Sequence, residues 1–135
     1  MIGLDTNVLV RYLAQDDPKQ SALATRLIEK QLSVARPGFV SLVVLAETCW
    51  VLGRLYAATQ EELASTIEDL LTTAQFHIER REVVQEAVQH FNEAKRSTAG
   101  FVDVLISKLA SSEGCSQIVT FDKAAVRGAG MTLLA

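Results

Sequence analysis

Hydrophobic residues recur along this chain mainly at the three-to-four-residue spacing of helices, and short apolar runs lie between the helical stretches. The pattern predicts helices over residues 8–13, 18–31, 42–55, 59–72, 82–95 and about 99–113, and strands over residues 1–4, 39–41, 76–78, 117–120 and 131–134. The resulting order, β-α-α-β-α-α-β-α-α-β-β, is typical of a mainly parallel sheet covered by helices on both faces. The expected fold class is therefore α/β.

Turn and cap residues mark the boundaries between these elements. Asp17 followed by Pro18 predicts a helix start, and Thr59 predicts another. Gly128-Ala129-Gly130 predicts a turn into the last strand. A lone Gly-x-Gly lacks the third glycine of a dinucleotide fingerprint, so no nucleotide cofactor is expected there.

The composition indicates one globular domain over residues 1–135, with 49% hydrophobic residues. Cys49 and Cys115 are far apart and at no metal-binding spacing, which predicts reduced thiols in a cytoplasmic protein. The longest apolar stretch, residues 39–46, is too short to span a bilayer, and charged residues interrupt any signal-peptide core. No membrane partner is therefore expected. A net charge of −3 neither favours nor excludes a nucleic-acid enzyme.

Two acidic residues stand in unusual positions in this pattern. Asp5 follows the first apolar run and precedes a helix, so it is expected at the carboxyl end of a strand, where active sites gather in α/β sheets. A helix cap at Asp5, Thr6 or Asn7 is the structural alternative. Glu47 is flanked by apolar residues and has no Lys or Arg three or four positions away. Its carboxylate must be exposed, protonated, paired from elsewhere or bound to a cation.

Two further acids follow late in the chain. Asp103 lies in the first turn of a helix with apolar flanks, where an acid also favours the helix dipole, and Asp122 comes just after a strand. If the four acids converge, they repel one another by about 4 kcal/mol per pair at an effective dielectric constant near 20. A divalent cation removes this repulsion, and an all-oxygen ligand set selects Mg²⁺ or Mn²⁺. Such a metal site suggests phosphodiester hydrolysis.

Four motifs give a resemblance to a known family. Asp5-Thr6-Asn7, Leu45-Ala46-Glu47, Phe101-Val102-Asp103 and Thr120-Phe121-Asp122 together resemble the motifs of PIN-domain ribonucleases, in particular the VapC-type toxins of type II toxin-antitoxin systems. The resemblance covers essentially the whole chain. It implies a three-layer α/β/α sandwich with a mainly parallel central sheet, one nuclease domain over residues 1–135, and a Mg²⁺- or Mn²⁺-dependent endoribonuclease.

The resemblance also implies roles for individual residues and partners. Asp5, Glu47, Asp103 and Asp122 would be the catalytic acids and the metal ligands, with Asp5 and Asp103 the foremost direct ligands. The positions that commonly orient these acids are Thr6, Asn7, Ser41 and Thr120. The implied partners are an RNA substrate, a cognate antitoxin protein and a second copy of the chain in a homodimer.

Residues that could contact RNA are less well defined. The basic candidates are Arg11, Arg54, Lys95, Arg96, Lys108 and Lys123. For each of them an ordinary surface charge is the simpler interpretation. Tyr12 and Trp50 could stack on bases, but their apolar helix neighbours favour a place in the core. His77 and His90 fit no catalytic or metal-binding pattern and are interpreted as structural or surface residues.

Other function classes remain open at this stage. A haloacid-dehalogenase-like phosphatase also carries an acid after its first strand, but it needs an aspartate where this chain has Asn7. A receiver domain would need an acid pair near the first strand, which is missing. A metal-dependent phosphatase and a non-catalytic module that binds nucleic acid or protein stay as alternatives.

Overall fold

The computed structural model describes residues 1–94 and 99–134 and divides the chain into two compact units. The first unit consists of Met1–Thr59 and Asp69–Arg81, and the second of Gln60–Glu68 and Glu82–Ala135. Helix α4 (Gln60–Thr72) contributes to both units: residues 60–68 belong to the second unit and residues 69–72 to the first. Each unit is described by itself below.

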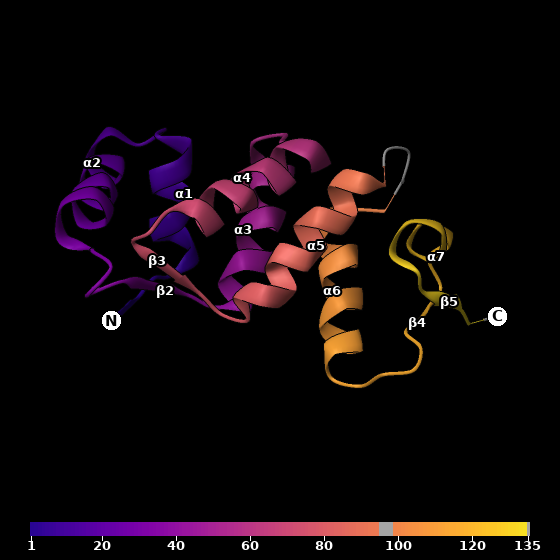
Figure 1. Cartoon of the computed structure of the whole chain (residues 1–135). Helices are drawn as coiled ribbons and strands as arrows, with labels where there is room; N and C mark the ends of the chain where they lie inside the picture. The colour runs from indigo at the N-terminus through magenta and orange to yellow at the C-terminus, as the bar shows by residue number, and fades with distance from the viewer. Residues whose placement is uncertain (95–98, 135) are drawn as a thin grey trace. The chain divides into compact units, whose positions relative to one another are not determined.

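A three-stranded parallel sheet organises the first unit (Figure 1). Its order is β1 (Ile2–Gly3), β2 (Gly38–Val40) and β3 (Phe76–Ile78), and both strand pairs are parallel. Because the strands are parallel, the residues that follow each strand lie along the same edge of the sheet. Asp5 follows β1 along this edge, and Ser41 follows β2.

Three helices of the first unit follow the predicted spacing closely. They are α1 (Thr6–Ala14), α2 (Pro18–Arg26) and α3 (Leu42–Leu55). Asp17 caps α2 as predicted, because its Oδ1 accepts a hydrogen bond from the backbone N–H of Gln20 at 2.9 Å. The predicted helix over residues 18–31 is α-helical only to Arg26 and continues as a π-helical turn, η1 (Leu27–Gln31).

The core of the first unit is aliphatic. Leu9, Ile28, Val40 and Leu45 are all fully buried, in line with the apolar faces expected for their elements. The expectation for Trp50 is wrong, because its side chain is 61% exposed. The buried face of α3 includes Leu45 and Cys49, and Trp50 lies outside that face.

The second unit contains α5 (Arg81–Glu93) from Glu82 onward, α6 (Phe101–Ser112), β4 (Val119–Thr120), α7 (Lys123–Ala129) and β5 (Thr132–Leu133). Phe101 is fully buried and packs edge-on against Phe91, with ring centroids 6.2 Å apart. Lys95, the expected end of the helix that begins near residue 82, lies outside the described residues, as does Arg96.

One predicted connection in the second unit is wrong. The turn expected at residues 128–130 is instead the end of α7, and Gly130 takes the left-handed conformation that closes this helix, with φ of 69°. Because a helix intervenes, β4 and β5 pair in parallel. The sequence signal was weak here because α7 is short and its only strong cue is Asp122 at its start.

The two cysteines differ in environment, and this gives a first testable prediction. Cys49 is buried and desolvation raises the pKa of its thiol to about 12, whereas Cys115 is exposed. At pH 8 only about one Cys49 thiol in ten thousand would be ionised. We expect iodoacetamide to add one label to the native protein and two in urea, counted by intact mass. Two labels on the native chain would contradict the burial of Cys49.

No helix in the described part of the chain is both long enough and apolar enough to cross a membrane.

Candidate active site

A hollow of about 330 Å³ opens in the first unit beside Asp5 and Glu47. We call it the Asp5–Glu47 hollow. Residues of α1 and α3 line it together with the residue that precedes α1 and the one that follows α3. The described lining residues are Asp5, Thr6, Asn7, Val10, Arg11, Glu47, Val51, Leu55 and Tyr56.

Asp5 is both a lining residue of the hollow and the N-cap of α1. Its Oδ1 accepts a hydrogen bond from the backbone N–H of Thr6 at 2.8 Å, and its own backbone is extended, as at a helix N-cap. Its Oδ2 has no hydrogen-bond partner among the described residues. Asp5 can therefore act as the helix cap and as a site residue at the same time, because Oδ1 binds the first turn of α1 and Oδ2 has no partner among the described residues.

Glu47 lies on the exposed face of α3. Across residues 1–94 and 99–134 its carboxylate has neither a hydrogen bond nor an ion pair. Of the four states considered for this residue, the structure shows the exposed one. Glu47 needs no partner to be tolerated in α3, so its side chain is available to a ligand at the hollow.

Thr6 and Asn7 line the hollow with Asp5. Thr6 is buried, with 7% of its surface exposed, and its Oγ1 has no hydrogen-bond partner in the described structure. A buried hydroxyl without a partner is unfavourable, so a group that binds at the hollow could also satisfy Thr6. Asn7 is exposed.

The donor groups of the hollow suit a hard cation. Asp5 and Glu47 offer carboxylate oxygens, and Mg²⁺ commonly binds through one or two carboxylates while it keeps several waters. Within the described ranges, no three His, Cys, Asp or Glu side chains form a group that could hold a metal ion. The first unit thus supplies two of the four predicted acids.

Asp103 and Asp122 belong to the second unit, and each stabilises the start of a helix there. Asp103 Oδ2 accepts a hydrogen bond from the backbone N–H of Gly100, the N-cap residue of α6, at 3.2 Å. Asp122 Oδ1 accepts one from the N–H of Ala124 at 2.8 Å and caps α7. In each carboxylate the other oxygen has no partner among the described residues.

Ser41 and Thr120, two residues expected to orient the acids, contact the backbone instead of a carboxylate. Ser41 Oγ accepts a hydrogen bond from the N–H of Val44 at 3.1 Å and caps α3, the helix that carries Glu47. Thr120 Oγ1 accepts one from the N–H of Asp122 at 3.0 Å, which fixes the backbone at that acid. Each therefore acts on the segment that bears the acid.

Glu79 was missed by the sequence analysis. Its Oε1 accepts a hydrogen bond from the N–H of Leu42 at 2.8 Å, and so it satisfies a second donor at the start of α3. The available signal was its position directly after β3, at the same sheet edge as Asp5 and Ser41.

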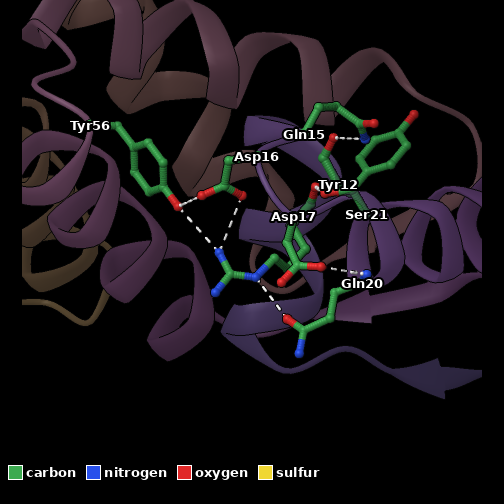
Figure 2. A network of polar contacts seen from close by, with 8 residues as sticks. Tyr12, Gln15, Asp16, Asp17, Gln20, Ser21 and Tyr56 are labelled. Carbon is green, nitrogen blue, oxygen red and sulfur yellow. Dashed lines mark hydrogen bonds and ion pairs between the residues drawn. The ribbon is translucent and has the colours of Figure 1, made fainter.

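Arg11 and Tyr56 form a polar network at the hollow that the sequence did not predict. Arg11 Nη1 donates to Tyr56 Oη at 3.2 Å and to Asp16 Oδ1 at 3.3 Å. Figure 2 shows Tyr56 and Asp16 directed toward each other, and the Tyr56 hydroxyl donates to Asp16 Oδ2. The hydroxyl and the nearby guanidinium lower the pKa of Asp16, and the carboxylate raises the pKa of Tyr56. Sequence spacing gave no signal, because Tyr56 is 40 residues from Asp16.

Comparison with protein families decides the affiliation of the chain. The PIN domain model matches residues 2–130. The chain belongs to the PIN domain family. This match includes Asp5, Glu47, Asp103 and Asp122, and it extends through segments of both units. No curated protein and no solved structure matches the chain.

Membership in the PIN domain family agrees with the parallel strands and the many helices of the structure, and it establishes an α/β sandwich class. PIN domains are generally nucleases, so the family supports a hydrolase that acts on nucleic acid.

Proposed function

We propose that this PIN domain is a Mg²⁺- or Mn²⁺-dependent endoribonuclease that hydrolyses phosphodiester bonds in RNA. The observation that supports it best is that Asp5 and Glu47 line one hollow, each with at least one carboxylate oxygen that has no partner among the described residues. Two carboxylates that line one hollow suit a divalent cation better than they suit the direct binding of an anionic strand.

Asp5 and Glu47 would hold the cation from the first unit, and we propose, from the motifs that resemble those of PIN-domain ribonucleases, that Asp103 and Asp122 are the two other catalytic acids. When bound, the metal polarises a phosphoryl oxygen and lowers the pKa of a bound water. The chain contributes orientation, because the backbone N–H groups of Thr6 and Ala124 each hold one carboxylate oxygen, of Asp5 and of Asp122 respectively. Ser41 and Glu79 fix the start of the helix that carries Glu47.

The biological role we propose is that of a VapC-type toxin in a toxin-antitoxin pair. The support is the set of four motifs that resembles these toxins, within a chain that the PIN model matches over residues 2–130. In this role the protein would act in the cytoplasm, form a homodimer and be silenced by a cognate antitoxin. A small upstream reading frame that encodes a DNA-binding protein would support the role. The absence of such a reading frame from the operon would count against the toxin role.

Metal removal tests the proposed activity directly. We expect the protein to cut a mixed-sequence RNA in Mg²⁺ or Mn²⁺ and to lose cleavage in EDTA, with recovery when metal is added back, as followed by denaturing gel electrophoresis. Glu47→Gln should lose cleavage as well, with unchanged circular dichroism because the Glu47 carboxylate has no hydrogen bond or ion pair within residues 1–94 and 99–134.

Glu61→Gln, at an exposed acid of α4, is the matched control and should cut at the parent rate. Cleavage that persists in EDTA would overturn the metal dependence. Turnover of para-nitrophenyl phosphate without RNA cleavage would indicate a phosphatase, and RNA binding without any cleavage would indicate a non-catalytic module.

A further inference from the structure

Arg11 is the one basic residue among the described side chains that line the Asp5–Glu47 hollow. Its guanidinium carries five N–H donors. Nε donates to Gln20 Oε1 at 2.8 Å, and Nη1 donates to Asp16 and to Tyr56. Nη2 has no hydrogen-bond partner in the described part of the chain. Two of the three guanidinium nitrogens, Nε and Nη1, are therefore engaged, and the two N–H groups of Nη2 remain for a ligand.

We infer that Arg11 binds a phosphate group of the RNA strand through Nη2, at the rim of the hollow that Asp5 and Glu47 share. This inference rests on the proposed function, because it assigns a binding residue for the same substrate at the same hollow. It adds a cationic contact that the four acidic motifs do not include.

Electrostatics give the physical reason for such a contact. Two carboxylates at the hollow repel the phosphates of an incoming strand, and a cation that lines the same hollow offsets part of this repulsion. A guanidinium stays protonated, and the N–H groups of Nη2 can donate charge-assisted hydrogen bonds to phosphate oxygens. Arg11 is also held in place before the substrate arrives, so little side-chain entropy is lost on binding.

The network around Arg11 also has a structural explanation, and the two roles make different predictions. Through Gln20 and Tyr56, Arg11 joins α1 to α2 and to the residue that follows α3. A purely structural Arg11 would affect the unfolding free energy and leave RNA binding unchanged. It would not account for an Nη2 without a partner among the described residues, on an arginine that lines a hollow together with two acids.

The test is equilibrium binding of a short, fluorescein-labelled single-stranded RNA in EDTA, titrated over a range of NaCl concentrations. We expect Arg11→Gln to weaken binding about tenfold and to reduce the slope of log Kd against log [NaCl] by about 0.7, the value for one lost phosphate contact on a single strand. Tyr56→Phe removes the hydroxyl and keeps the cation, so its slope should equal that of the parent.

Arg36→Gln is the matched control. Arg36 is exposed and precedes β2, so it lies toward the opposite end of the parallel strands from Asp5. Its salt slope should not change. Arg11→Lys keeps the positive charge but loses the guanidinium N–H donors. Its salt slope should therefore equal that of the parent, and it should retain only part of the affinity that Arg11→Gln loses. Circular dichroism of each variant confirms that it is folded under the binding conditions.

The outcomes separate this inference from the proposed function. If the parent cuts RNA in a metal-dependent way while Arg11→Gln keeps the parent affinity and salt slope, the inference is wrong and the function stands. An equal loss of slope in Arg36→Gln would also overturn it, because any surface cation would then suffice. If the slope depends on Arg11 but no RNA is cut, the phosphate contact is supported and the nuclease proposal fails. A parent that does not bind RNA in EDTA overturns the inference, and the cleavage assay in Mg²⁺ then decides the proposed function separately.

Discussion

Asp5→Asn should reduce RNA cleavage by at least about a hundredfold while the protein stays folded. The substitution removes the negative charge that the proposed cation needs. It preserves an oxygen that can accept the hydrogen bond from the Thr6 N–H, because Asn and Asp are about equally good N-caps. Cleavage rates are measured with saturating Mg²⁺, and folding is measured by urea unfolding followed by circular dichroism.

A second substitution at Asp5 separates its two roles. Asp5→Ala should lose cleavage to the same extent and should also lower the unfolding free energy by about 1 kcal/mol, because the cap is lost. Asp69→Asn, at an exposed position of α4, is the matched control and should leave both measurements unchanged. Parent-like cleavage by Asp5→Asn would remove Asp5 from the site.

Phe101→Ala should destabilise the protein by about 3–5 kcal/mol, the largest effect that we expect on stability. Phe101 is fully buried, packs edge-on against Phe91 and is the first residue of α6. Its removal leaves a cavity beneath the helix turn that carries Asp103. The urea midpoint, monitored by circular dichroism, measures the loss.

Phe121→Ala provides the same chemical change at an exposed position. Phe121 is 80% exposed, so the change in unfolding free energy should stay within about 0.5 kcal/mol. Comparably small losses of unfolding free energy for the two variants would mean that Phe101 does not lie in the core. A parent-like midpoint for Phe101→Ala would have the same meaning.

The sequence predicted the elements wherever periodicity was long and strong. The helix over residues 42–55 and the strand at 76–78 have the predicted bounds, since apolar spacing and clear breaks agree there. It failed at α7 and at Trp50. Both failures concern tertiary context, because a short helix has little periodic signal and an apolar run does not say which face is buried.

The candidate site was predictable only in part. Position after a strand and the absence of helical charge partners singled out Asp5 and Glu47, and the structure brings these two to one hollow. The network of Arg11, Asp16 and Tyr56 depends on contacts over as many as 45 residues, which no local pattern encodes. The single domain over residues 1–135 and the joint action of all four acids stay predictions.

The helix caps have a consequence for the energetics of metal binding. Asp5, Asp103 and Asp122 each give one oxygen to the start of a helix, so folding itself restricts the rotation of these carboxylates. The conformational entropy of these carboxylate side chains is therefore lost when the protein folds, and less of it remains to be lost when a cation binds. If these carboxylates bind a cation as proposed, each would lose less rotational freedom on binding, and the fold would not depend on the cation to form these helices.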